Sequence, residues 1–322
     1  MKRIIVIGND TQWCYYSWYY YAKEHDIKYY SREMPLNLPS CLVYLCRKHF
    51  TPRINLPFKR IWYPLFLKSL NIKQNEDTII IIYDRNVLTF ERKFIKLLRK
   101  KYSKLRLVYM FTNVARISGA SDHNLLDELT FTYDIVFAFD KLDSKKYGFN
   151  YNPLIYTAKL PETDESSIKD SDLFYIGLAK DRLSVLLEIF EKAKKQGLKC
   201  DFNIVGVPDA FQKYSNEIKY NTPMKYSEVL QHIKHTKCLV DVIQGNSTGY
   251  TIKTAEAIVL GRKLLTTNVN IEREPFYSSD KILIYPQRDL SKDFILSDYG
   301  VEENAGKHYF SPDVLINKII NL

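Results

Sequence analysis

The segment "DTIIIIYD" (Asp77–Asp84) is the clearest strand in this sequence of 322 residues. Its four consecutive isoleucines show no alternation of polar and apolar positions, which is the pattern of a strand buried on both faces. The segment "RIIVI" (Arg3–Ile7) is a second continuous apolar run of the same kind. Strands of this type belong to parallel sheets that helices cover on both sides.

Outward from these two segments, strands alternate with helices along the whole chain. In the first half, further strands are predicted at Ile27–Tyr30, Arg106–Phe111 and Asp134–Phe139, and helices at Thr11–His25 and Leu88–Lys104. In the second half, strands are predicted at Asp172–Gly177, Asp201–Gly206, Cys238–Ile243, Lys263–Thr267 and Lys281–Tyr285, and helices at Asp181–Gly197, Lys225–Thr236 and after the turn that begins at Gln244. This order predicts an α/β protein with two tandem Rossmann-like domains and a cleft between them.

A stretch rich in Asp, Ser, Asn and Pro separates the two halves, from about Asp140 to Asp170, and has the composition of a linker. We therefore expect an N-terminal domain over residues 1–150, a linker over 151–170 and a C-terminal domain over 171–322. The last helix is a candidate to pack back on the N-terminal domain.

The composition, with 46% hydrophobic and 26% charged residues, is that of an ordinary globular protein. The net charge of +10 favours an anionic partner, such as a phosphorylated small molecule or an acidic membrane surface. Nucleic acid ranks last, because no DNA- or RNA-binding signature accompanies the charge. The five cysteines are scattered without CxxC spacing, and no signal peptide or membrane span is evident. We expect a cytoplasmic protein.

Two strand-to-helix turns of the second half lie where ligands of open parallel sheets bind, outside the carboxyl ends of the strands. They are "YIGLAKDRLS" (Tyr175–Ser184) and "QGNSTGYTIKTAE" (Gln244–Glu256). Lys180, Arg182 and Lys253 stand at the starts of the two helices. Positive charges at these positions are repelled by the positive end of the helix dipole, and a bound anion would offset this repulsion. The turns therefore predict a site for a diphosphate, with solvated loop charges as the alternative.

Glu256 follows Lys253 by three residues on the second of these helices. It could pair with Lys253, but such a pair contributes only about 0.2–0.5 kcal/mol, and Lys before Glu is the less favourable order. It is not a capping-box glutamate, because Thr251 occupies the position three after Thr248. A carboxylate just behind a glycine-containing loop could instead accept hydrogen bonds from two adjacent hydroxyls, the pair that a ribose presents.

Three segments of the second half carry a family resemblance. They are "DLFYIGLAKDRLSVLLEIFEKAKKQGLKCDFNIVG", "YNTPMKYSEVLQHIKHTKCLVDVIQ" and "TGYTIKTAEAIVLGRKLLTTN". They resemble the nucleotide-binding domain of GT-B glycosyltransferases, and most closely that of the bacterial enzymes of lipopolysaccharide and capsular polysaccharide assembly. The resemblance covers about Phe139 to Asn270, and the first 138 residues only by architecture.

The resemblance implies a glycosyltransferase that moves a sugar from a nucleotide-diphosphate sugar to a glycan or lipid-linked acceptor on the N-terminal domain. It implies that Lys180 and Arg182 contact the donor phosphates and that Glu256 binds the ribose. Six further residues would shape the donor pocket or let the backbone approach the nucleotide: Gln244, Thr251, Lys253, Gly177, Gly206 and Gly249.

The sequence departs from the family at Thr248, where many retaining members carry a first glutamate eight positions before the second. A retaining assignment therefore does not carry over. Neither half contains a DxD motif presented on a loop for a divalent cation. Basic side chains and helix termini can stabilise a departing diphosphate instead. We expect no obligatory metal and no cofactor beyond the nucleotide sugar.

An inverting transferase also needs a general base, usually a carboxylate or histidine of the N-terminal domain. Asp10 follows the first strand and Asp84 ends "IIIIYD", so both lie at carboxyl ends of strands. Asp10 could equally cap the next helix, and Asp84 could only form a turn. His123 is taken as a surface residue. His232 and His235 are taken as ordinary helix residues, because no third metal ligand accompanies them.

Two basic stretches suit anionic lipid headgroups. Arg47–Lys68 interleaves cations with aromatic residues, and Glu91–Arg106 is a helix with an almost wholly cationic polar face. A solvated helical face is the alternative, and for the second stretch alone it is the preferred one. The first stretch is the better candidate for contact with the inner face of the plasma membrane.

Two other function classes compete with a glycosyltransferase. One is a non-catalytic GT-B-like protein that binds a nucleotide or a partner. The other is a Rossmann dehydrogenase, which is disfavoured because "IVIGNDTQW" lacks the GxGxxG fingerprint and no other glycine-rich turn replaces it.

Overall fold

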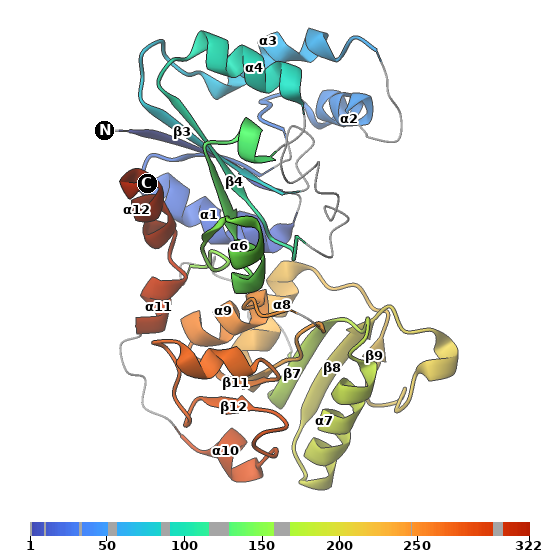
Figure 1. Cartoon of the computed structure of the whole chain (residues 1–322). Helices are drawn as coiled ribbons and strands as arrows, with labels where there is room; N and C mark the ends of the chain where they lie inside the picture. The colour runs from blue at the N-terminus through green and yellow to red at the C-terminus, as the bar shows by residue number, and fades with distance from the viewer. Residues whose placement is uncertain are drawn as a thin grey trace. The chain divides into compact units, whose positions relative to one another are not determined.

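A computed structural model describes residues 2–9, 11–31, 34–50, 57–84, 91–115, 129–157, 168–245, 247–298 and 305–322. The chain forms two compact units, each built on one parallel sheet (Figure 1). The first unit comprises Met1–Asn152 and Leu315–Leu322, and the second comprises Pro153–Val314.

The sheet of the first unit has the order β2-β1-β3-β4-β5-β6, and all its strands are parallel. Its strands are β1 (Arg3–Ile7), β2 (Lys28–Tyr30), β3 (Thr78–Tyr83), β4 (Leu105–Met110), β5 (Ile135–Ala138) and β6 (Asn150–Tyr151). The direction of winding reverses between β1 and β3, so a topological switch point lies at their carboxyl ends.

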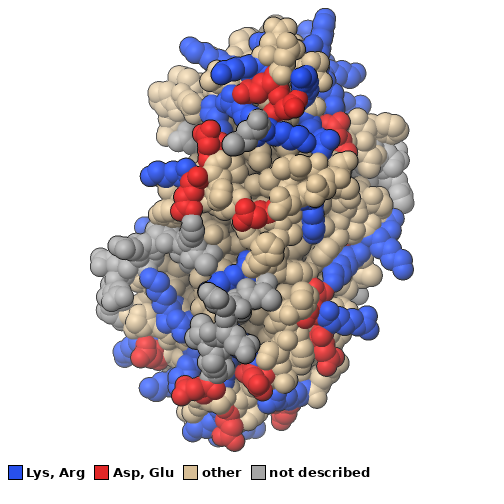
Figure 2. Space-filling model, turned by 90° about the vertical axis from the view of Figure 1, so that its left-hand side faces the viewer, with Lys and Arg blue, Asp and Glu red and all other residues tan. Residues whose placement is uncertain are grey.

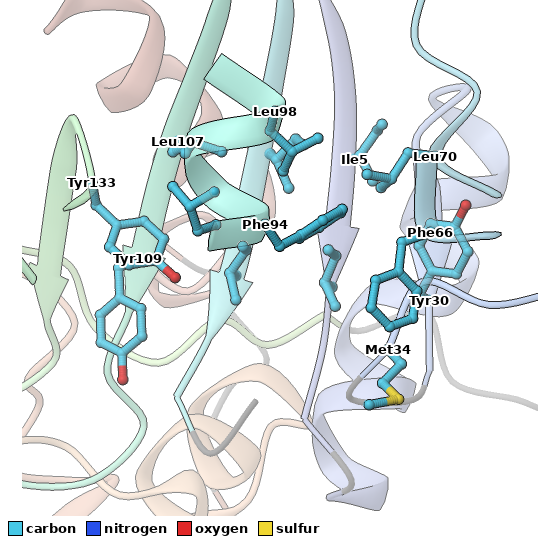
Figure 3. Packing of buried hydrophobic residues seen from close by; sticks show 14 of the residues in the cluster. Ile5, Tyr30, Met34, Phe66, Leu70, Phe94, Leu98, Leu107, Tyr109 and Tyr133 are labelled. Atoms are coloured by element: carbon cyan, nitrogen blue, oxygen red, sulfur yellow. The ribbon is translucent and has the colours of Figure 1, made fainter. Parts of the chain in front are cut away.

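The described helices of the first unit are α1 (Gln12–Glu24), α2 (Ser40–His49), η1 (Lys59–Trp62), α3 (Tyr63–Leu70), α4 (Arg92–Lys101) and α6 (Lys141–Tyr147). They cover both faces of its sheet (Figure 1). Side chains of α3 and α4 pack on one face, where the rings of Phe66 and Phe94 meet at 5.3 Å between centroids beside Ile5 (Figure 3). On α1, the buried Trp18 donates from its indole nitrogen to the hydroxyl of Tyr83, at 2.6 Å.

The C-terminal helix, α12 (Pro312–Asn321), joins the first unit from Leu315 onward. Arg106 on β4 donates to the carbonyl of Ile319 at 2.6 Å, and Lys318 donates to the side-chain oxygen of Asn152 at 3.1 Å. These contacts attach the end of the chain to the sheet of the first unit.

The sheet of the second unit has the order β12-β11-β10-β7-β8-β9, again all parallel. Its strands are β7 (Ser171–Leu178), β8 (Cys200–Val205), β9 (Lys219–Tyr220), β10 (Thr236–Asp241), β11 (Lys263–Thr266) and β12 (Ile282–Ile284). Its described helices are α7 (Leu183–Lys195), η2 (Asp209–Phe211), α8 (Tyr226–Lys234), α9 (Ile252–Val259), η3 (Val269–Arg273), α10 (Lys292–Leu296) and α11 (Ala305–Tyr309). The switch point lies between β7 and β10.

The predicted fold class is confirmed, since two Rossmann-like α/β units follow one another along the chain. Local differences have physical reasons. The polar segment after Asp140 looked like the start of a linker, but it forms α6, because the Asp140 carboxylate caps the backbone N–H of Leu142 and Gly148 ends the helix at a φ of +68°. The expected cleft between the domains and their boundaries stay predictions. None of the described helices is long and apolar enough to cross a membrane.

A buried lysine holds part of the second unit together. Lys263 begins β11 and is fully buried, and its ammonium donates to the carbonyl of Phe294, to the carbonyl of Ser297 at 2.5 Å and to the hydroxyl of Ser297 at 2.7 Å. These acceptors lie at the C-terminal end of α10, where a cation also meets the negative end of the helix dipole.

We expect Lys263→Met to lower the free energy of unfolding by about 2–3 kcal/mol, because the charge-assisted hydrogen bonds from the buried lysine to Phe294 and Ser297 are lost while the apolar stem is kept. Urea unfolding followed by circular dichroism measures the change. The exposed Lys195→Met serves as the control and should change stability by less than about 0.5 kcal/mol. Equal stability of the two variants would contradict a structural role for the Lys263 ammonium.

Candidate functional site

The switch point of the second sheet brings the two predicted turns together. Gly177 and Leu178 end β7, and Asp241 ends the neighbouring strand β10. The loops that follow both strands leave from the same edge of the sheet. This is the edge at which ligands of doubly wound sheets bind.

Three polar contacts tie these loops to each other. The ammonium of Lys180 donates to the side-chain oxygen of Gln244 at 2.8 Å, and a guanidinium nitrogen of Arg182 donates to the carbonyl of Val242 at 2.9 Å. The backbone N–H of Gly245 donates to the carboxylate of Asp181 at 3.0 Å. Lys180, Arg182 and Gln244, predicted as one group, therefore do lie together, and Asp181 adds a carboxylate that the sequence analysis did not single out.

Helix α9 starts at the same edge with a side-chain cap. The hydroxyl oxygen of Thr251 accepts from the backbone N–H of Lys253 at 3.1 Å and from that of Thr254 at 3.4 Å. The half-buried ammonium of Lys253 reaches back to β7, where it lies 5.4 Å from the centre of the Tyr175 ring. A Cβ built at Gly177 would lie 3.5 Å from this ammonium, which is an ordinary van der Waals contact. The Lys253 ammonium therefore lies directly beside Gly177.

Glu256 points into the protein rather than to solvent, with 3% of its surface exposed. Its Oε1 accepts a hydrogen bond of 2.7 Å from the hydroxyl of Tyr226, at the start of α8. The hydroxyl oxygens of Tyr226 and Tyr156 are 2.9 Å apart. Because each hydroxyl carries one proton, Tyr226 donating to Glu256 makes Tyr156 the donor to Tyr226. The result is a chain of two tyrosine hydroxyls that ends on the glutamate.

Burial raises the pKa of Glu256 to about 7, although the positive charge of Lys253 and the Tyr226 hydrogen bond act in the opposite direction. Asp241, also buried, accepts from the hydroxyl of Thr254 at 2.7 Å, and burial raises its pKa as well. Burial lowers the pKa of Lys253, and the two carboxylates oppose that shift. The site therefore holds two buried carboxylates close to the half-buried Lys253.

The raised pKa of Glu256 predicts a pH dependence of stability. A carboxyl whose folded pKa lies above its unfolded value of 4.5 contributes stability below pH 4.5 that is lost as the pH rises through about 7. We expect this loss to be about 3 kcal/mol and to be absent in Glu256→Gln, which does not titrate. Urea unfolding of both proteins at pH 5 and pH 8 measures the difference. The same pH dependence in both would contradict the assignment.

The two remaining predicted glycines have different surroundings. Gly206 follows β8 with a φ of +79°, a conformation that L side chains rarely adopt, and its N–H donates to the side-chain oxygen of Asn221 at 2.7 Å. The carbonyl of Gly249 accepts from the buried side-chain amide of Asn268 at 3.4 Å. All nine predicted donor residues thus belong to the second unit, and their donor contacts stay predictions.

On the first unit, Asp10 and His123 lie outside the described residues. Asp84, at the end of β3, is 5% exposed. Its carboxylate accepts from the hydroxyl of Thr112 and from the backbone N–H of Asn113 at 3.2 Å. Asp84 therefore stabilises the loop after β4 through these hydrogen bonds. It would have to give them up in order to accept a proton from a substrate as a base. The identity of a base stays a prediction.

His232 is held by structural contacts on the second unit: its Nδ1 meets the carboxylate of Asp201, and its ring stacks on Phe174 at 5.1 Å. In the described part of the chain, no three His, Cys, Asp or Glu side chains gather as metal ligands could.

Sequence reasoning missed Asp241, Tyr226 and Tyr156 as members of this site. Asp241 carried a signal, since it is a carboxylate inside the apolar run "CLVDVI", next to the edge where ligands bind. Tyr156 carried none, because it lies in the segment assigned to the linker and reaches Tyr226 only through the fold.

Comparison with known proteins defines the fold. No family model matches the chain, and no curated protein matches it. One similar solved structure is an alpha-glucosyltransferase in complex with UDP and a 13-mer DNA containing a HMU base, with a TM-score of 0.53 and 14% identity over 99% of this chain and 93% of that chain. Another is an alpha-glucosyltransferase in complex with UDP, with a TM-score of 0.47 and 12% identity over 83% of this chain and 80% of that one.

A third is the Glycosylation Associate Protein (Gap123) complex from Streptococcus agalactiae, with a TM-score of 0.41 and 12% identity. The match covers 70% of the present chain and 49%, about half, of the chain in that complex. None of these three descriptions mentions lipopolysaccharide or capsule, so that part of the resemblance stays a prediction. The first comparison, which extends over nearly the whole chain, supports the two-domain GT-B fold for this protein.

Proposed function

We propose that this protein is a glycosyltransferase that moves a sugar from a nucleotide-diphosphate donor to an acceptor. The observation that supports it most is the group at the switch point of the second sheet: a buried carboxylate at Glu256, and the ammonium of Lys253 directed to Gly177. Carboxylate and cations near a strand edge suit a ribose and a diphosphate, respectively.

The residues would act on the donor in two ways. Ionised Glu256 would accept hydrogen bonds from the ribose hydroxyls, with Tyr226 holding its other oxygen. Lys180, Arg182 and Lys253 would balance the charge that develops on the diphosphate as the sugar leaves, aided by the positive end of the α9 helix dipole. Gln244 and Thr251 would hold the two cationic loops in place through the contacts they already make. No metal ion is required in this scheme.

On the acceptor side, we propose a glycan or lipid-linked acceptor in cell-surface polysaccharide synthesis, such as lipopolysaccharide or capsule, at the inner face of the plasma membrane. The net charge of +10 supports an anionic neighbour. The similar glucosyltransferase structure contains UDP and DNA. A uridine-diphosphate sugar is therefore the first donor to test. A DNA duplex should also be tested as an acceptor, although we expect no transfer to it.

The test is a thermal-shift panel of UDP-, GDP-, CMP- and dTDP-sugars. A donor at 100 times its dissociation constant should add about 2.7 kcal/mol of stability. We expect one nucleotide class to raise the melting temperature of the wild type but not that of Arg182→Ala. The exposed Arg273→Ala should respond as the wild type does. If no nucleotide shifts the wild type, the donor site is refuted. If a nucleotide binds but no sugar is transferred to any acceptor, the non-catalytic binding protein becomes the better account.

A further inference from the structure

A second candidate site lies on the first unit, in a groove of about 530 Å³ bordered by η1, α3 and α4. Its most buried lining residues are apolar or aromatic: Tyr63, Ile72 and Tyr102. Arg60, Lys68 and Lys101 also line it, and all three are exposed. The groove thus combines an apolar base with a cationic rim, and its volume lies in the range of small-molecule sites.

The rim cations form no ion pair with any carboxylate in the described part of the chain. The ammonium of Lys101 lies 5.4 Å from the centre of the Tyr102 ring. The carboxylate of Glu91 is engaged by the hydroxyl of Tyr63 at 2.6 Å. On the face that Figure 2 shows, lysine and arginine side chains are spread over the first unit, at the top of the picture, with fewer acidic ones among them. Unpaired cations around an apolar base suit an anion with an apolar body.

Exposed apolar side chains lie directly beside Arg60. In η1 and just before it, Phe58 is 77% exposed and Ile61 is 61% exposed. On α2, Leu45 is 55% exposed, and one turn later His49 accepts a hydrogen bond of 3.1 Å from Trp62 of η1. Large apolar side chains that face water among cations are typical of surfaces that enter the headgroup region of a membrane.

We propose that the groove between α3 and α4 binds the phosphate headgroup of an anionic membrane lipid, while Phe58 and Ile61 enter the interface beside it. The cations supply the attraction to the phosphate, and the apolar base receives the first part of the lipid's hydrocarbon or glycerol backbone. This site lies on a different unit from the proposed donor site and does not depend on sugar transfer.

The test is co-sedimentation of the full chain with vesicles of phosphatidylglycerol and phosphatidylcholine in equal parts, with vesicles of phosphatidylcholine alone for comparison. Each cation near an anionic surface contributes about fivefold in affinity, so Arg60→Gln, Lys68→Gln and Lys101→Gln together should weaken binding about 100-fold. The matched control removes three exposed cations of the second unit: Lys195→Gln, Lys199→Gln and Lys213→Gln. It should bind the mixed vesicles within about fivefold of wild type.

A second variant separates a membrane lipid from a soluble phosphate. Phe58→Ser with Ile61→Ser should weaken vesicle binding at least about tenfold and leave the binding of soluble glycerol phosphate unchanged. The proposal is overturned if the groove variant binds vesicles as wild type does, if the control variant loses as much, or if glycerol phosphate binds and vesicles do not. Because no donor is present in these assays, the results do not test sugar transfer and bear only on the membrane location included in the proposed function.

Discussion

Substituting Glu256 with alanine is expected to weaken binding of the nucleotide-sugar donor about 100- to 1,000-fold. An ionised carboxylate that accepts from both ribose hydroxyls makes two charge-assisted hydrogen bonds, and at about 1.5–2 kcal/mol each their loss amounts to 3–4 kcal/mol. Every 1.4 kcal/mol is about a tenfold change in affinity. Isothermal titration calorimetry with the donor selected by the thermal-shift panel measures the effect.

The same substitution is not expected to unfold the protein. Because burial raises the pKa of Glu256 to about 7, its charge destabilises the unliganded fold at neutral pH, and removing it relieves that penalty. Glu256→Gln keeps the volume and the acceptor for Tyr226, and serves as the variant in which only the charge is lost. The exposed Glu272→Ala is the matched control. A loss in affinity below tenfold for Glu256→Ala would remove Glu256 from the ribose site.

The main strands of the fold could be predicted from sequence because their signal is local. Each strand at the centre of a sheet contains a run of apolar residues, such as Ile79–Ile82 in β3, that is buried on both faces. Such a run can be recognised without knowing which strands pair with it. The two-residue strand β6 could not be predicted, since Asn150 and Tyr151 are extended only because they pair with Phe137 and Ala138 of β5. Short edge strands depend on a partner that lies elsewhere in the sequence.

The candidate site shows the same division. Lys253 and Glu256 could be singled out as candidates from the sequence, because the position of Lys253 at the positive end of the helix dipole and the unfavourable Lys-before-Glu order are visible within one helix. The tyrosines that hold Glu256 were not, because Tyr226 starts another helix and Tyr156 precedes the second sheet altogether. Long-range hydrogen bonds to a buried carboxylate leave no mark on local periodicity.

Substituting Lys253 with methionine is expected to lower kcat about 100- to 1,000-fold. The ammonium lies beside Gly177, on the edge where the diphosphate would be, so it can stabilise the charge that develops as the sugar leaves. Methionine keeps the apolar stem against Tyr175 and removes only the charge. Initial rates at saturating donor measure kcat, and Lys199→Met, an exposed cation of the same unit, is the control.

Lys253 could also act through its neighbour, because its charge lowers the pKa of Glu256. Without the ammonium, Glu256 would hold its proton to a higher pH, and donor binding would weaken near neutrality for that reason alone. The two effects separate in the kinetic constants, because weaker donor binding raises KM, whereas lost stabilisation of the leaving diphosphate lowers kcat at saturating donor. We expect the main loss in kcat. An unchanged kcat with a raised KM would make Lys253 a residue that tunes Glu256 rather than one that contacts the leaving group.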